Sequence, residues 1–467
     1  MKTKYIQFYL LTFSVLTLYM SSCSDEIILE SDPFVLAFES LSKNLTAIES
    51  KENIKIVYSE IAQENGYVTV QISPKNAIYG IDFTTIPEAS ANKITLPIVS
   101  GEIKNSITFQ KLNPSLDETT EIEFTLISLD YNNSNIQGNS SFLINATASL
   151  GGSFKPEVGG PNEGNQVFVD LSSQSSTITQ RDSWDLGFYN GTNFRVTING
   201  SIYMATKALT ETNIDAISEA DVSSLQSQVA VGTFDIANVT YVDAPNGNIL
   251  ETAIAEISEN DNENPVYLLN LGYQVGTDIP TKGSVAVAGD QRGWKKIRIL
   301  RNNNNYILQY ANLNDTSHQE VIISKNTAYN INHFSFNTNT ILNIEPKKEK
   351  WDLCFTVFTN VLNGAGSYGF SDFSFHNRKG NALVYRVNTS DLQYDNFDVN
   401  NIIELNFSRD LTTIGSTWRN VFDGTAYDDR FYIIRDPNGN NYKLRFLALT
   451  NNDGIRGYPE FEYKLLQ

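Results

Sequence analysis

Residues 181–188 read Arg-Asp-Ser-Trp-Asp-Leu-Gly-Phe, and residues 348–355 read Lys-Glu-Lys-Trp-Asp-Leu-Cys-Phe. Each segment follows a strand-like run, residues 166–171 in the first case and residues 332–337 in the second. Side chains of a strand alternate between two faces, which predicts Trp, Leu and Phe on one side and Asp on the other. We therefore expect Trp184 and Trp351 to anchor a core, and Asp185 and Asp352 to cap turns or accept backbone N–H groups.

Strand patterns dominate the rest of the chain and predict an all-β protein. At most one short helix is expected, within residues 210–228, where apolar residues recur at near-helical spacing. A clear hairpin is predicted over residues 430–446, because Asn438-Gly439 supplies the positive φ angles of a tight reversal. The final strand, residues 458–465, is expected to close the sheet of this antiparallel domain.

Residues 34–149 form a first unit, in which residues 121–129 alternate acidic and apolar side chains in the manner of a sandwich with one wet face. Residues 79–84 (Tyr-Gly-Ile-Asp-Phe-Thr) and 118–121 resemble the Calx-β module. That resemblance implies the fold and a spacer role, but the calcium-binding acids of the module are not all present. Residues 150–165 are rich in loop formers and predict a linker, so residues 166–467 make a second, larger domain.

The N-terminus has the pattern of an export signal. Two lysines precede an apolar run over residues 5–19, which is too short for a membrane span, and Met20-Ser21-Ser22-Cys23 follows. We expect cleavage after residue 22, acylation of Cys23 and a tether over residues 23–33 that anchors the chain in an outer membrane, exposed at the cell surface. Ordinary secretion with an incidental cysteine is the alternative.

Composition excludes several classes of protein. The net charge is -19, which argues against a nucleic-acid partner. Cys354 is the only cysteine besides Cys23, so neither a disulfide framework nor a zinc site of cysteines is expected. No Gly-x-Ser-x-Gly, His-Glu-x-x-His or phosphate-loop motif is present, and we expect no enzyme. A catalytic role for Asp185 or Asp352 lacks a suitable neighbouring partner.

The order of motifs over residues 166–467 resembles the longer members of the HmuY family. These motifs are the Trp-Asp-Leu strand, Phe355–Asn360, Ser367–Phe373 and the Asp-Pro-Asn-Gly hairpin followed by Gly457-Tyr458-Pro459-Glu460. The resemblance implies an extracytoplasmic, all-β lipoprotein that binds haem beside an outer-membrane receptor and serves iron acquisition. It also implies two axial side chains, His or Met, between the Trp-Asp strand and the last hairpin. This interval has no methionine and one histidine, His376.

Haem binding requires one or two strong-field side chains in an apolar slot. The candidates are His376, His318, His333 and Met204, and His376 is preferred because it lies in the family's ligand interval. Each of them has an ordinary structural alternative, either as a strand or surface polar group or, for Met204, as core filler. The functional prediction is capture of haem or a related tetrapyrrole for uptake. A surface glycan-binding or adhesion module is the alternative, since aromatic and asparagine side chains suit sugars.

Overall fold

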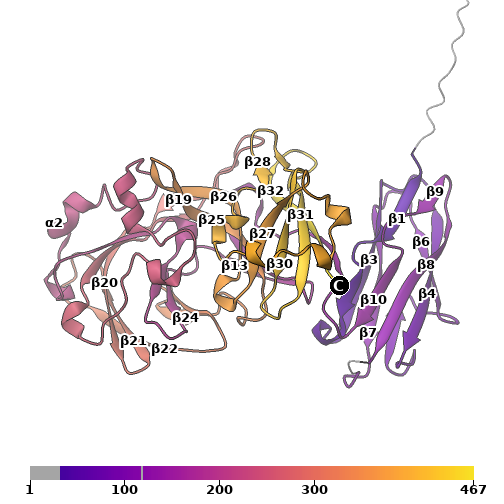
Figure 1. Ribbon diagram of the computed structural model, residues 1–467, viewed down its shortest axis with the longest axis horizontal. Coiled ribbons are helices and arrows are strands. Elements are labelled where there is room, and N and C mark those ends of the chain that lie inside the picture. Colours follow the sequence, from indigo (N-terminus) through magenta and orange to yellow (C-terminus); the bar gives the residue numbers. More distant parts are fainter. Residues whose placement is uncertain (1–31, 117–118) are drawn as a thin grey trace, which may run out of the picture.

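The computed structural model describes residues 32–116 and 119–467. The expected signal peptide and Cys23 lie outside these residues. Nearly all of the regular structure is β-strand, as the sequence predicts. In Figure 1 a sandwich of indigo and purple strands forms one end of an elongated molecule, the C-terminal yellow strands lie in the middle, and β20, β21 and β22 lie toward the other end. No helix of the described residues has the length and apolarity to cross a membrane.

The N-terminal unit is a sandwich of two five-stranded sheets, ordered β5-β7-β3-β1-β9 and β2-β10-β8-β4-β6. Alternate residues of β3, β4 and β8 are buried in its separate apolar core, which confirms the predicted period-two pattern. The strands are β1 (Phe34–Phe38), β2 (Ser42–Asn44), β3 (Lys51–Tyr58), β4 (Gly66–Lys75), β5 (Phe83–Ile86), β6 (Lys93–Ile98), β7 (Lys104–Lys111), β8 (Glu121–Asp130), β9 (Ser134–Ile136) and β10 (Ser141–Asn145).

Four larger sheets and two small hairpins make up residues 151–467. Their orders are β11-β32-β31-β30-β27, β13-β12-β25-β26, β15-β14-β23-β24 and β16-β17-β20-β21-β22, with the pairs β18-β19 and β28-β29. The strands up to the second Trp-Asp segment are β11 (Gly151–Phe154), β12 (Asn165–Asp170), β13 (Ser175–Gln180), β14 (Leu186–Tyr189), β15 (Val196–Ile198), β16 (Ala205–Ala208), β17 (Val266–Asn270), β18 (Tyr273–Val275), β19 (Ala288–Gln291), β20 (Trp294–Asn302), β21 (Asn305–Ala311), β22 (Gln319–Ser324), β23 (Ile331–Ser335) and β24 (Thr340–Leu342).

The chain then continues through a second set of strands and many short turns. The strands are β25 (Leu353–Leu362), β26 (Gly366–His376), β27 (Leu383–Asn388), β28 (Arg419–Asn420), β29 (Thr425–Ala426), β30 (Arg430–Arg435), β31 (Asn441–Thr450) and β32 (Arg456–Leu465). The helical segments are α2 (Glu219–Val222) and the 3-10 turns η1 (Leu45–Ala47), η2 (Gly160–Asn162), η3 (Gly200–Ile202), η4 (Ile214–Ala216), η5 (Ser223–Leu225), η6 (Ile236–Tyr241), η7 (Ile249–Glu251), η8 (Asp261–Glu263), η9 (Arg378–Gly380), η10 (Tyr394–Asn396), η11 (Val399–Asn401), η12 (Glu404–Asn406) and η13 (Leu411–Thr413).

The two Trp-Asp segments belong to two structurally equivalent repeats. In the first repeat the Asn199 side-chain amide donates to the carbonyls of Arg181 (2.7 Å) and Trp184 (2.8 Å). In the second, the Asn377 amide donates to the carbonyls of Lys348 (2.7 Å) and Trp351 (2.9 Å). Each asparagine also caps a 3-10 turn, η3 or η9. The same hydrogen-bond network is therefore present in both repeats. The equivalence of the repeats extends from the eight-residue Trp-Asp segments to Asn199 and Asn377.

The repeats are interlocked because the first strand of each repeat pairs with a strand of the other repeat. Strand β12 of the first repeat pairs with β25 of the second, and β23 of the second pairs with β14 of the first. The aromatic rings follow this exchange: Phe168 packs edge-on against Trp351 at 5.1 Å between centroids, and His333 against Trp184 at 4.6 Å. Neither repeat completes its Trp-Asp sheet alone.

The predicted face of the tryptophans is wrong. Leu186 and Phe188 lie in the core of the first repeat, whereas Trp184 lies with Trp351 in a separate cluster between the repeats. The physical reason is that β14 begins at Leu186, so the two-residue alternation does not extend back to Trp184. The aspartates accept backbone N–H groups, from Phe336 to Asp185 (2.7 Å) and from Leu171 to Asp352 (2.7 Å).

Residues 210–228 contain one short α-helix, α2, as the sequence predicts, with the 3-10 turns η4 and η5 on either side of it. Two further details differ from the sequence prediction. Residues 151–154, within the expected linker, form β11 and pair with β32. The final strand β32 consequently lies between β31 and β11 and is not the edge of its sheet. A strand contributed from the other side of the domain is a long-range pairing that local sequence patterns do not encode.

Candidate functional site

A cavity of about 150 Å³, partly open to solvent, lies where the two repeats meet. One wall comes from β15 and η3 of the first repeat, and the opposite wall from β25, β26 and η9 of the second. The segment between β16 and β17 closes a third side. The lining residues on which the argument depends are Met204, Val242, Asp243, Val357, Phe375 and Lys379.

The repeated asparagine network positions both principal walls. Asn199 caps η3 by accepting the Ser201 N–H (3.0 Å), and Asn377 caps η9 by accepting the Gly380 N–H (2.8 Å). Ser201 and Lys379 of these turns both line the cavity. The Thr359 hydroxyl donates to the Gly200 carbonyl (2.6 Å), which ties the turn of one repeat to the strand of the other. The cavity is thus held open by contacts between rigid elements.

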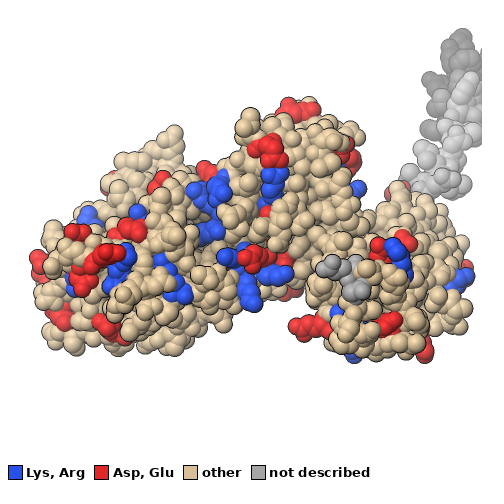
Figure 2. Space-filling model, turned by 60° about the horizontal axis from the view of Figure 1, so that its bottom comes forward, with Lys and Arg blue, Asp and Glu red and all other residues tan. Residues whose placement is uncertain are grey.

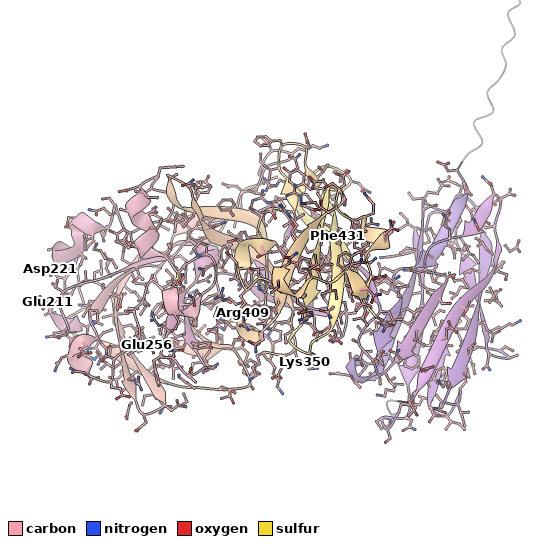
Figure 3. The ribbon with its side chains drawn as sticks, in the orientation of Figure 1. Glu211, Asp221, Glu256, Lys350, Arg409 and Phe431 are labelled. Carbon is pink, nitrogen blue, oxygen red and sulfur yellow. The ribbon has the colours of Figure 1, made fainter. Side chains whose placement is uncertain are left out.

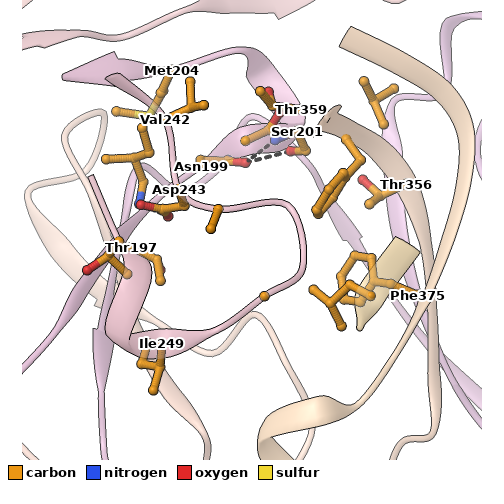
Figure 4. A pocket seen from close by; sticks show the side chains of 18 of the residues that line it. Thr197, Asn199, Ser201, Met204, Val242, Asp243, Ile249, Thr356, Thr359 and Phe375 are labelled. Atoms are coloured by element: carbon orange, nitrogen blue, oxygen red, sulfur yellow. Dashed lines mark hydrogen bonds between the residues drawn. The ribbon is translucent and has the colours of Figure 1, made fainter. Parts of the chain in front are cut away.

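The lining is mainly apolar. Figure 4 shows Met204, Val242 and Asp243 on one side of the cavity and Thr356 and Phe375 on the other. Thr356 is buried, and its hydroxyl has no hydrogen-bond partner among the described residues. An unpaired buried hydroxyl costs about 1–3 kcal/mol, so this group is a polar contact that a ligand would satisfy. A mainly apolar surface with polar side chains placed in it is typical of small-molecule binding sites.

Asp243 and Lys379 are the two ionisable side chains of the cavity wall, and the positive charge is on Lys379. Its half-buried side chain forms no hydrogen bond and no ion pair within 4.0 Å with any described residue. Burial lowers the pKa of the Lys379 ammonium, and the nearby Glu345 and Asp243 oppose that shift. Burial in turn raises the pKa of Asp243 to about 6 and that of Glu345 to about 7. A ligand carboxylate would supply the partner that Lys379 lacks.

Two more basic side chains lie beside the same part of the second repeat. The Arg378 guanidinium donates to the carbonyls of Asn246 (2.9 Å) and Arg409 (2.9 Å), which precede cavity residues Gly247 and Leu411. Figure 3 places Arg409 near the middle of the molecule, whereas Glu211, Asp221 and Glu256 lie toward its far end. Figure 2 shows basic side chains near the middle of one face, with acidic side chains among them.

None of the three histidines, all within the described residues, lines this cavity. His376 is buried on β26 beside Phe375, and neighbouring side chains of a strand point to opposite faces. His333 lies behind Trp184. His318 lies in an outer loop of the first repeat, with Nδ1 3.0 Å from Asp215. Burial lowers the pKa of His376 and of His333 to about 3, so both rings are neutral at pH 7.

Met204 is the one sequence candidate that the structure places at the cavity. It is fully buried and also belongs to the apolar core of the first repeat. Lys379 was not among the predicted site residues, and the sequence signal for it is weak. It lies three residues after His376 in a polar turn, and only the exchange of strands brings it opposite Met204.

The fold and the cavity define a protein of two interlocked β-repeats with a pocket at their junction. The sequence model of the HmuY family ("HmuY protein") matches residues 162–331 and 328–463, which together make up more than half of the chain. The chain therefore belongs to the HmuY family. The junction of the two matched segments coincides with the start of β23, the first strand of the second repeat.

Two solved structures show low similarity to the chain, and the comparison with curated proteins finds no match. The chain is similar to the apo-form Calx CBD1 domain, at 11% identity and a TM-score of 0.20, over 24% of this chain and 96% of that one. It is similar to CBD12 from CALX1.2 at 10% identity and a TM-score of 0.20, over 31% of this chain and 75% of that one. No curated protein matches the sequence.

The resemblance to characterised HmuY proteins implies haem held between paired axial side chains, and the cavity residues do not fit that arrangement. Among the described residues, one thioether, Met204, and no imidazole lines the cavity. No group of three or more His, Cys, Asp or Glu residues in residues 32–116 and 119–467 is arranged to hold a metal ion. What the cavity does offer is a mainly apolar surface with the Lys379 ammonium and the Asp243 carboxylate on its wall.

Proposed function

We propose that this chain is a non-catalytic cell-envelope protein that binds haem or a related tetrapyrrole in the cavity between its two repeats. The observation that carries the proposal is the apolar cavity with the unpaired Lys379 ammonium on its wall. A tetrapyrrole has large apolar faces that bury well in such a slot, and its carboxylates match a single cation. Membership of the HmuY family supports the same ligand class.

The proposal includes the place of action. Acylation at Cys23 would anchor the chain in the outer membrane, and the N-terminal sandwich would act as a spacer that carries the binding region away from the lipid, toward an outer-membrane receptor. Net charge of -19 suits a soluble domain facing the medium. Cys23→Ser should move the protein from the membrane fraction to the soluble fraction after cell fractionation. Retention of this variant in the membrane fraction would contradict the lipid anchor at Cys23.

The experiment is a titration of the purified chain, residues 32–467, with haemin and with its dimethyl ester. Lys379→Met should weaken haemin binding about tenfold, because a charge-assisted hydrogen bond contributes about 1.5–3 kcal/mol, and should leave ester binding unchanged. The control is Lys348→Met, since the Lys348 side chain is 40% exposed and lies outside the cavity. Absence of saturable haemin binding would refute the proposal, and retention on a polysaccharide gel would then favour a glycan ligand.

A further inference from the structure

We infer that the cavity holds its tetrapyrrole without ligating a metal, so that a metal-free porphyrin binds as well as haemin. This inference rests on the proposed function and specifies its ligand class. It follows from the mismatch between the cavity lining and an axially ligated haem. The potential ligands in and around the cavity show this mismatch, and His318 lies in an outer loop away from it.

His376 is excluded by its position on β26. Its backbone pairs with Leu353, whose side chain lies in the core of the second repeat, and paired residues of antiparallel strands share a face. Phe375, the next residue toward the N-terminus, points to the cavity. The His376 ring is 1% exposed, and rotation of its side chain cannot carry it through its own strand.

His333 is one layer away from the cavity. The Trp184 ring, which lines the cavity, packs against the imidazole at 4.6 Å with an interplanar angle of 78°. The His333 backbone lies within β23, between β14 and β24, so the ring is fixed by two neighbouring strands. For His333 to reach a metal, Trp184 would have to leave the cluster that joins the repeats.

Three further side chains with potential metal-ligating atoms, those of Cys354, Asp243 and Met204, are also unsuited to ligate the iron. Cys354 is fully buried in the cluster between the repeats. The Asp243 carboxylate, which does line the cavity, accepts the N–H groups of Ile198 (3.0 Å) and Ala253 (2.9 Å). A lone thioether such as Met204 is a weak partner for ferric iron compared with an imidazole or thiolate.

The features left for recognition are common to all tetrapyrroles. The apolar walls from Val242, Val357 and Phe375 contact a ring face whether or not a metal is at its centre. Lys379 would pair with a peripheral carboxylate, which is equally remote from the metal. Affinity should therefore follow the ring and its carboxylates, and should be insensitive to iron.

The test compares haemin with metal-free protoporphyrin on residues 32–467, using quenching of tryptophan fluorescence to obtain both Kd values. We expect the two values to agree within about threefold, and bound haemin to lack the low-spin spectrum that two axial side chains would produce. His376→Gln and His333→Phe should leave both Kd values within threefold. Met204→Leu should change both by the same factor. Circular dichroism checks that each variant is folded.

Two outcomes would overturn the inference and leave the proposed function intact: haemin binding at least tenfold tighter than the metal-free ring, or selective loss of haemin binding in Met204→Leu or His376→Gln. Failure of both ligands to bind would instead refute the proposed function itself. The two failures are therefore distinguishable.

Discussion

At the scale of single residues, Asp185 and Asp352 occupy equivalent positions in different electrostatic surroundings. Asp185 forms a buried ion pair with Arg292, 2.6 Å apart, with side chains 0% and 6% exposed. Asp352 has no ion pair with any described residue, and burial together with Asp170 and Asp436 raises its pKa well above the ordinary range. Burial also raises the pKa of Asp185, but there the Arg292 guanidinium opposes the shift.

This difference predicts that the same substitution changes the free energy of unfolding by different amounts at the two positions. Asp185→Asn should lower the free energy of unfolding by about 3–5 kcal/mol, because Arg292 is left buried without a counter-charge. Asp352→Asn should change it by less than about 1 kcal/mol, because the amide oxygen still accepts the Leu171 N–H. Urea unfolding at pH 7 measures both. Equal losses in the two variants would contradict this assignment of charge.

At the scale of elements, the exchanged strands place His333 where the other repeat has Phe168. The buried imidazole has a pKa of about 3, lower than in the unfolded chain. Below about pH 6.5 the unfolded chain therefore binds a proton that the folded chain does not. The stability contributed by neutral His333 is complete above that pH and is lost as pH falls toward 3.

His333→Phe should remove this loss. At pH 5 the loss amounts to about 2 kcal/mol, since one pKa unit corresponds to about 1.4 kcal/mol. The variant should gain stability relative to the parent as pH falls from 7 to 5, with thermal unfolding as the readout. His318→Gln, at a partly exposed loop position, is the control and should follow the parent. A parallel pH dependence of parent and His333→Phe would disprove the burial argument.

At the scale of the whole molecule, the repeats are one cooperative unit, because β12 pairs with β25 and β23 with β14. Residues 150–330 and 331–467, expressed separately, should each fail to fold, since both expose unpaired strand edges and half of the cluster between the repeats. Mixing them should restore a stable complex, detected by gel filtration and circular dichroism. Residues 32–149, which have a separate core, should fold alone. A folded single repeat would show that the exchange is not essential.

Local sequence patterns determined much of this architecture. The alternation in β3, β4 and β8, the reversal between β30 and β31 and the doubled Trp-Asp motif are short-range features, and the structure contains them. In the reversal Gly439 takes a positive φ of 91°, whereas Asn438 does not take the positive φ that was expected of it. They are predictable because side-chain parity and turn geometry depend on neighbouring residues only. Membership of the HmuY family was likewise readable from the order of motifs.

Tertiary structure alone decided where the functional groups lie. From the sequence, His376 was the preferred ligand candidate. The pairing of β26 with β25 directs the His376 side chain toward an apolar core. The exchange of strands between the repeats brings Lys379 and Met204 to the same cavity. The alternation of side chains along a strand determines which residues share a face. It does not determine which of the two faces lines the cavity. That choice is made by pairings between residues more than 180 positions apart, such as Val169 with Leu353, because burial of both tryptophans requires both repeats at once.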